Sequence, residues 1–272
     1  MTGQGPAERS RHIVFALVWA GVVITLVWSV PTRMPPSPPA QMLYDAIEKC
    51  PPDKLILLST SWDVGTRGEN GPQTAAIVRH LFKSNRKFAI FGWVHPPGPM
   101  LAEQIARTLA KQYHKRYGVD WVNWGYKTGL VPMIQGLAKD VPAIIREDLF
   151  HTPVGRIRVM QGVRDYKDIA MVIDITGSAT LDTWITYWQG VYGTQIGYAC
   201  TGVMVPEAFP RLDAGQIKGV LKGLVGAAEY ETLLGVSGDG QQRMTSQSVV
   251  HVLIIALILL GNIMALRARR KT

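Results

Sequence analysis

The sequence predicts a doubly wound α/β fold with a single, mostly parallel sheet of about five strands, flanked by a transmembrane helix at each end of the chain. Short apolar runs alternate with longer amphipathic stretches, which is typical of parallel strands joined by crossover helices. No linker rich in proline, glycine and polar residues interrupts this alternation, so residues 41–236 are expected to form one domain. An uncharged apolar stretch of 18 residues lies near each end, over 13–30 and 249–266.

The first apolar stretch, residues 13–30, is long enough to cross a bilayer, since its 18 residues span roughly 27 Å as a helix. It follows a short tail, residues 1–12, that carries Arg9 and Arg11. A cleaved signal peptide is the alternative, because such peptides also begin with basic residues and an apolar run. No A-x-A cleavage site follows the run, which favours an uncleaved signal anchor.

The second apolar stretch, residues 249–266, is followed at once by the basic tail RARRKT at 267–272. Basic residues that flank a span stay on the cytoplasmic side of the membrane. Both ends of the chain therefore predict cytoplasmic termini at the cell (inner) membrane, with residues 31–248 outside the cytoplasm. Residues 31–40 are rich in proline and are expected to form a stiff spacer, and residues 237–248 a linker to the second span.

Two polar residues, His251 and Asn262, lie within the second apolar stretch. They are eleven residues apart, close to three helical turns, so they share one face of the helix. Polar side chains in hydrocarbon usually meet a partner helix or a cavity. The pair predicts a contact with the first span, a membrane-protein partner or a second copy of the chain. Alternatively, His251 lies at the headgroup level and only Asn262 is immersed.

The middle of the chain is expected to contain five strands and five helices. The expected strands are short apolar runs at residues 54–60, 87–93, 119–124, 168–175 and 194–202. The expected helices are residues 72–84, 100–117, 130–138, 179–192 and 214–234. The first of these helices is expected to begin at Pro72, because proline is favoured at the first helical position. Residues 144–160 show no clear periodicity.

Three glycines recur every four residues in the last expected helix, at Gly215, Gly219 and Gly223. Each glycine in a helix costs about 1 kcal/mol relative to alanine, so the repeat requires a reason. Glycine allows another backbone to approach closely. The three residues are therefore candidates for a contact with the sheet, or with a helix of another protein.

The net charge of +9 does not indicate a nucleic-acid partner. Residues 1–12 contribute +1 and residues 267–272 contribute +4, so more than half of the charge flanks the membrane. The lipid bilayer is the expected partner instead. Six histidines and two cysteines show no metal-ligand spacing, and neither a metal nor a cofactor is predicted.

The two cysteines, Cys50 and Cys200, are expected to be free thiols. Cys50 lies before the amino end of the first strand, whereas Cys200 lies near the carboxyl end of the fifth. Opposite ends of parallel strands of this length are roughly 20 Å apart. A disulfide requires Cα atoms closer than about 7 Å.

Polar residues follow or end several of the expected strands. The carboxyl ends of parallel strands meet at one edge of the sheet, where α/β proteins bind their ligands. The candidate pocket residues at this edge are Ser59, Thr60, Ser61, Asp63, His95, Asp174, Thr176, Ser178 and Thr201. The competing interpretation is that Ser, Thr and Asp collect there as ordinary helix N-caps.

No established catalytic motif is present: the chain lacks both GxSxG and GxxxxGK[ST]. Ser61, His95 and Asp174 can be drawn as a triad, but similar sets can be drawn in any α/β domain. The sequence therefore favours a tethered external domain that acts as a scaffold or ligand-binding component of a membrane complex. The alternative is an anchored hydrolase or transferase. Convergence of Ser61, Asp63 and Asp174 in an enclosed pocket would favour that alternative.

Three segments resemble an uncharacterised family of bacterial membrane proteins with an external α/β domain. They are YGVDWVNWGYKTG at 117–129, AGQIKGVLKGLVGAAEYETLLG at 214–235 and MTSQSVVHVLIIALILLGN at 244–262. The resemblance implies an external domain followed by a terminal span. It implies no activity and no catalytic residue.

Overall fold

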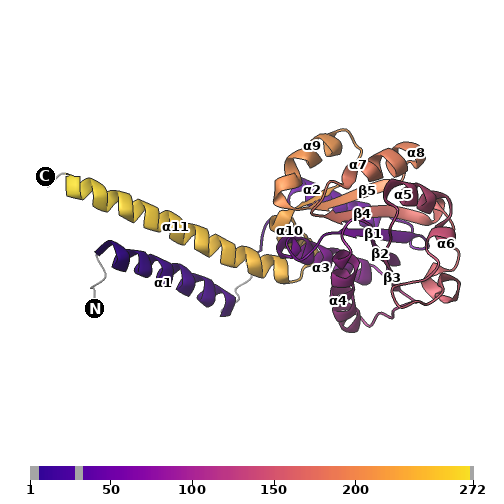
Figure 1. Ribbon diagram of the computed structural model, residues 1–272, viewed down its shortest axis with the longest axis horizontal. Coiled ribbons are helices and arrows are strands. Elements are labelled where there is room, and N and C mark those ends of the chain that lie inside the picture. The colour runs from indigo at the N-terminus through magenta and orange to yellow at the C-terminus, as the bar shows by residue number, and fades with distance from the viewer. Residues whose placement is uncertain (1–5, 28–32, 270–272) are drawn as a thin grey trace. The chain divides into compact units, whose positions relative to one another are not determined.

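A computed structural model describes residues 6–27 and 33–269 of the chain. The chain divides into two units, a central one over Met34–Gly240 and a terminal one that holds the two ends. Figure 1 labels most of the helices and strands of the two units. Expectations for residues 1–5, 28–32 and 270–272 lie outside the described residues.

The terminal unit holds two helices, α1 (Pro6–Val27) and most of α11 (Asp239–Arg269). Among the described residues, Asp239–Ile263 is the one helical stretch that is long and apolar enough to cross a membrane. α1 has 22 residues and begins inside the expected cytoplasmic tail. α11 runs without a break from Asp239, so most of the expected linker is helical and continuous with the second span.

The contact predicted for His251 and Asn262 stays a prediction, because both side chains are exposed. Elsewhere in the terminal unit, α1 and α11 do approach each other. A Cβ atom added to Gly21 would lie 3.2 Å from Cδ2 of Leu253. Glycine therefore leaves room for a leucine of the other helix.

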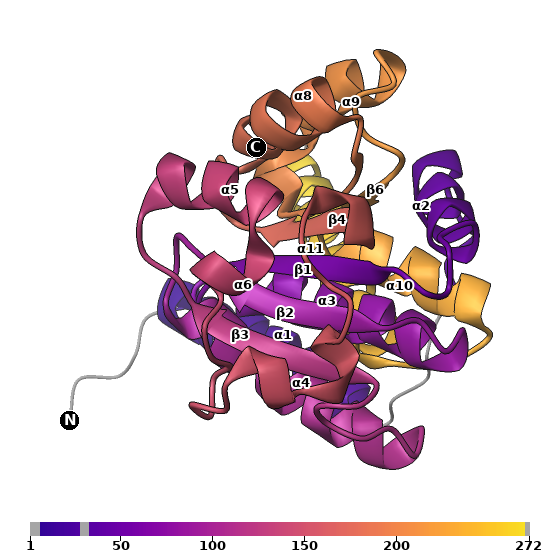
Figure 2. The ribbon, with the colours of Figure 1, turned by 90° about the vertical axis from the view of Figure 1, so that its right-hand side faces the viewer.

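The central unit is an α/β domain with one all-parallel sheet of six strands, in the order β3-β2-β1-β4-β5-β6. Figure 2 shows β3, β2, β1 and β4 one above another in that order. The strands are β1 (Leu55–Ser61), β2 (Phe88–Gly92), β3 (Trp121–Tyr126), β4 (Ile169–Thr176), β5 (Gln195–Cys200) and β6 (Val220–Lys222). The expected parallel sheet is confirmed, with six strands instead of about five.

Helices cover both faces of this sheet, which explains why β1 and β4 begin with continuous apolar runs and are buried along nearly their whole length. In β1, Leu55 and Leu57 belong to one buried cluster, whereas Ile56 and Leu58 belong to the other. The second cluster packs under α2 (Pro38–Glu48), α3 (Arg67–Lys83), α4 (Pro97–Gln112) and α10 (Gly223–Leu234). The first packs under α5 (Leu130–Lys139), α6 (Val141–Ile144), α7 (Leu181–Trp184) and α9 (Val205–Asp213).

The prediction of one continuous helix over residues 214–234 is wrong. Its first half contains a turn at Gly215, with φ of +71°, and then the sixth strand, and only its second half is α10. Gly215, Gly219 and Gly223 therefore do not share a helix face. Close approach does explain Gly219, because a Cβ atom there would lie 2.2 Å from the backbone nitrogen of Leu43 in α2. Gly223, with φ of +51°, opens α10.

Several other boundaries differ from expectation. α3 begins at Arg67, so Pro72 lies inside the helix instead of opening it. α2 begins within the expected spacer, and neither α2 nor α9 was predicted. The expected helix over 179–192 is divided into α7, a π-helical turn over Ile185–Gln189 and α8 (Gly190–Tyr192). Residues 144–160 include the short 3-10 turns Val154–Arg156 and Arg158–Met160.

Both cysteines are free, as expected, and both are buried. Cys50 follows α2, and Cys200 ends β5.

Candidate functional site

The candidate site lies at the carboxyl edge of the sheet. The strand order reverses between β1 and β4, because the chain builds outward to β3 from one side of this pair and to β6 from the other. Parallel α/β sheets bind ligands at such a switch point, in the crevice beyond the strand ends. The nine candidate residues lie in β1 and β4 or in the loops that follow β1, β2, β4 and β5.

Three of the candidates, Asp63, His95 and Ser178, form a cluster. Nε2 of His95 lies 2.6 Å from the hydroxyl of Ser178, within hydrogen-bond distance. Nδ1 of the same ring lies 3.7 Å from a carboxylate oxygen of Asp63, within ion-pair distance. The His95 and Asp63 side chains are 31% and 43% exposed, so the cluster is open to solvent. It joins the loops after β1, β2 and β4.

The loop that carries Ser178 is held from several sides. The Gly177 backbone N–H donates to the carbonyl of Ser61, and the Ser178 N–H donates to the Thr176 hydroxyl. A Cβ atom at Gly177 would lie 2.7 Å from Cγ2 of Thr66, so the loop passes too close to that residue for a side chain. These contacts hold the backbone of the loop at Ser178, and the His95 ring is the partner of its hydroxyl.

Asp174 forms a second, buried cluster. Its two carboxylate oxygens accept hydrogen bonds from Ser59, at 2.8 Å, and from Thr180, at 2.6 Å. The indole N–H of Trp93 donates in turn to the Ser59 hydroxyl. Burial raises the pKa of Asp174 to about 7, against the hydrogen bonds, which lower it. Asp174 thus ties the start of α7 to the central strands.

The remaining candidates divide into two groups. The hydroxyls of Thr60 and Thr176 donate to backbone carbonyls, at Phe91 and Ser61, and so hold strand ends together. The hydroxyls of Ser61 and Thr201 are buried and have no hydrogen-bond partner among the described residues.

The triad drawn from the sequence is therefore wrong in its pairing. The hydrogen-bond and ion-pair partners of His95 are Ser178 and Asp63, not Ser61 and Asp174. Ser61, Asp63 and Asp174 share no hydrogen bond among the described residues. The convergence of these three residues that would have favoured the enzyme alternative is therefore not found.

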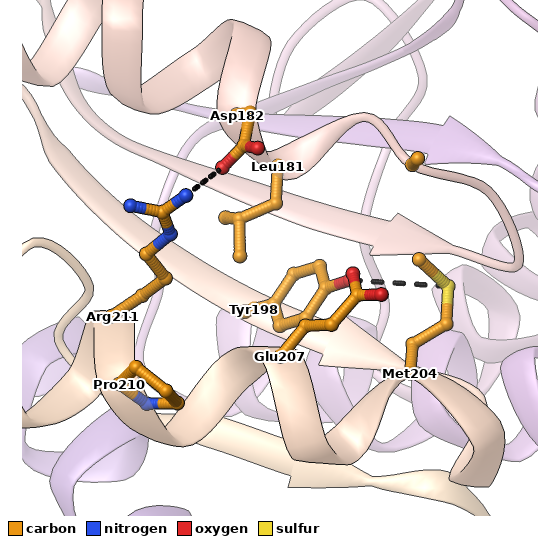
Figure 3. A pocket seen from close by; sticks show the side chains of 8 residues that line it. Leu181, Asp182, Tyr198, Met204, Glu207, Pro210 and Arg211 are labelled. Atoms are coloured by element: carbon orange, nitrogen blue, oxygen red, sulfur yellow. Dashed lines mark hydrogen bonds and ion pairs between the residues drawn. The ribbon is translucent and has the colours of Figure 1, made fainter.

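A cavity of about 400 Å³ lies next to the Ser178 loop, between α7, β5 and α9. Figure 3 shows its lining from close by, with the ring of Tyr198 between side chains of the two helices. The lining residues are Ala179, Leu181, Asp182, Tyr198, Met204, Glu207, Pro210 and Arg211. None of them was a candidate from the sequence. The available signal was the amphipathic segment Val205–Asp213, which has proline in its first turn.

The lining of this cavity contains two acidic side chains and one basic side chain. Arg211 forms an ion pair of 2.9 Å with Asp182, which joins α9 to α7 across the cavity (Figure 3). Glu207 makes no ion pair within the described part of the chain, so the lining carries an excess negative charge. Burial raises the pKa of Tyr198, and its phenol therefore stays neutral near neutral pH.

Comparisons of the chain with family models, with curated proteins and with solved structures found no match.

Proposed function

We propose that this protein is a membrane-anchored, extracytoplasmic binding domain that takes up a small amphipathic molecule at the carboxyl edge of its sheet. The cavity between α7, β5 and α9 carries this proposal. Its volume of about 400 Å³ is within the range of small-molecule sites, and it lies on the edge where parallel sheets bind ligands.

The lining of the cavity defines the class of ligand. Leu181, Tyr198 and Met204 offer apolar surface to the body of a small molecule. The carboxylate of Glu207 adds a negative charge that Arg211 does not balance, since Arg211 is paired with Asp182. A neutral or cationic molecule is therefore favoured over an anion of the same size.

Anchoring is proposed through both terminal helices, with both termini in the cytoplasm. The long apolar α11 supports a span, and the basic residues that flank the two apolar stretches support the orientation. The resemblance to bacterial membrane proteins with an external α/β domain agrees with this topology. His251 and Asn262, which are exposed on α11, favour a contact with another membrane helix or with a second copy of the chain. Such a contact would make the protein one component of a membrane complex.

Ligand-observed NMR on the full chain in lipid nanodiscs tests the binding function. Benzylamine, benzyl alcohol and benzoate share one ring and differ in charge, so they separate the two features of the lining. We expect saturation transfer to benzylamine and benzyl alcohol, and much less to benzoate. Empty nanodiscs provide the background for each probe.

A pair of matched variants locates the binding. Ala179→Trp fills the lining of the cavity, whereas Val203→Trp adds the same ring at a residue that is 87% exposed and outside the lining. We expect Ala179→Trp to abolish saturation transfer and Val203→Trp to preserve it. Equal signals from both variants, or no signal from the unmodified protein, would contradict the proposed function.

A further inference from the structure

We propose that Ser178 is a nucleophile that His95 activates, and that the site cleaves small carboxylic esters. This inference rests on the proposed function, because it takes the neighbouring cavity as the place where the substrate binds. Ser178 directly precedes Ala179, which lines that cavity. An ester whose acyl or alcohol group occupies the cavity would therefore present its carbonyl carbon to the loop of Ser178.

The geometry of the pair fits proton transfer. The 2.6 Å distance from the Ser178 hydroxyl to Nε2 of His95 is within the range for a nucleophile and its general base. The required tautomer has an unprotonated Nε2 and carries its proton on Nδ1, which is the nitrogen that faces Asp63. Asp63 is a positioning residue, since its carboxylate lies 3.7 Å from Nδ1 and stabilises the imidazolium that forms.

Both partners are held before any substrate arrives. His95 is followed by two prolines and accepts a hydrogen bond from the Gly98 N–H at its backbone carbonyl, which limits the freedom of its loop. The Ser178 loop is held by Gly177, by Thr176 and by the Asp174–Thr180 bond. Preorganisation of this kind is what positioned nucleophiles require.

The residue after Ser178 supplies a donor for the oxyanion. The backbone N–H of Ala179 makes no hydrogen bond to any described residue. In serine hydrolases of other folds, the N–H that follows the nucleophile binds the negative oxygen of the tetrahedral intermediate. A free N–H at Ala179 has the position in the chain to serve that role.

The reaction is an acyl transfer to water. As the Ser178 oxygen attacks the ester carbonyl carbon, His95 Nε2 takes the hydroxyl proton. The bond from that carbon to the alcohol oxygen then breaks, and His95 returns the proton to the departing alcohol. Water next attacks the acyl-serine with His95 as base, the acyl–serine bond breaks, the carboxylic acid leaves, and the proton returns to Ser178. No other reactant is needed.

A fluorophosphonate probe tests this directly on the full chain in nanodiscs. Attack by an activated serine expels fluoride and leaves the phosphonyl group on its oxygen. We expect mass spectrometry to place the adduct on Ser178, and p-nitrophenyl acetate to be hydrolysed. Ser178→Ala removes both signals, whereas Ser237→Ala, at an exposed serine of the same chain, changes neither.

Two further variants separate catalysis from loop structure. His95→Gln should slow labelling about 100-fold or more, because the general base is lost. Asp63→Asn should slow it less, and Asp63→Glu should restore part of the rate. Should His95→Gln prevent folding, Ser178→Cys in an otherwise unmodified chain gives a second readout, through alkylation by iodoacetamide. We then expect the thiol introduced by Ser178→Cys to react faster than the exposed thiol introduced by Ser237→Cys, because His95 lies within hydrogen-bond distance of position 178, and equal rates would overturn the proposal.

Absence of an adduct on Ser178, or equal labelling rates in the folded His95→Gln variant, would overturn the proposal. Different outcomes refute the nucleophile and the proposed binding function. If benzyl alcohol binds in an Ala179→Trp-sensitive way while Ser178 stays unlabelled, the nucleophile is refuted and the binding domain stands. If Ser178 is labelled while none of the three benzyl probes binds, the proposed ligand class is refuted.

Discussion

The hydroxyl of Thr180 donates a 2.6 Å hydrogen bond to the carboxylate of Asp174, and this bond joins the last part of β4 to the residue that precedes α7. Asp174 is fully buried at the centre of the sheet. Its burial raises its pKa to about 7, so the carboxyl group exchanges its proton near neutral pH. The loop that carries Ser178 lies between these two residues in the chain.

Asp174 should make stability depend on pH between about 4 and 7. In this range the folded protein holds a proton on Asp174 that the unfolded chain has already released, so stability falls as pH rises. The expected slope is roughly 1.4 kcal/mol per pH unit, and the curve flattens above the folded pKa. Asp174→Asn removes this slope in thermal unfolding of the full chain, whereas Asp182→Asn, at a side chain that is 74% exposed, preserves it. An unchanged slope in Asp174→Asn would refute the assignment.

Gly219→Ala should destabilise the central unit. The new Cβ atom would meet the backbone nitrogen of Leu43 at 2.2 Å, so α2 must move away from the sheet. We expect a loss of about 2–3 kcal/mol and a Tm lower by about 5–10 °C. Gly155→Ala is the matched control, because a Cβ atom there meets nothing within 4 Å. Equal Tm values for the two variants would contradict the close approach of α2.

The native thiols should be unreactive in the folded protein. Both are buried, and burial raises the pKa of Cys50 to about 11 and that of Cys200 to about 12, so almost no thiolate forms at neutral pH. A thiol-disulfide reagent such as DTNB should therefore react with both cysteines only after unfolding. Rapid reaction of the folded protein would show that one of these residues is accessible.

The fold class was predictable because strands buried on both faces carry continuous apolar runs instead of an alternating pattern. β1 and β4 illustrate this, since both form continuous apolar runs that end in polar residues. β6 was missed because it has only three residues, Val220–Lys222, between glycines that matched a helical period. α9 was not predicted: Pro206 lies in its first turn, where proline is tolerated, but Pro210 lies inside the helix, where proline usually breaks helical structure.

The candidate site was predictable as a list of residues but not as a set of contacts. Strand ends are visible in the sequence, so Asp63, His95 and Ser178 were all candidates. Which loops meet depends on the strand order, and no local pattern encodes the placement of β4 beside β1. The register that places Ser59 opposite Asp174, and so pairs them, has the same origin. The cavity depends on α9 and was missed with it.

In the proposed topology both termini lie in the cytoplasm and the central unit lies outside it, and cysteine labelling in sealed cells tests this arrangement. A membrane-impermeant maleimide should modify a cysteine placed at Gly68, where an added side chain meets nothing within 4 Å. It should spare a cysteine placed at Ala268 until the cells are opened. The buried native thiols keep the background low. Labelling at 68 and protection at 268 is the predicted result. Protection at 68 with labelling at 268 would place the domain in the cytoplasm and contradict the proposed topology.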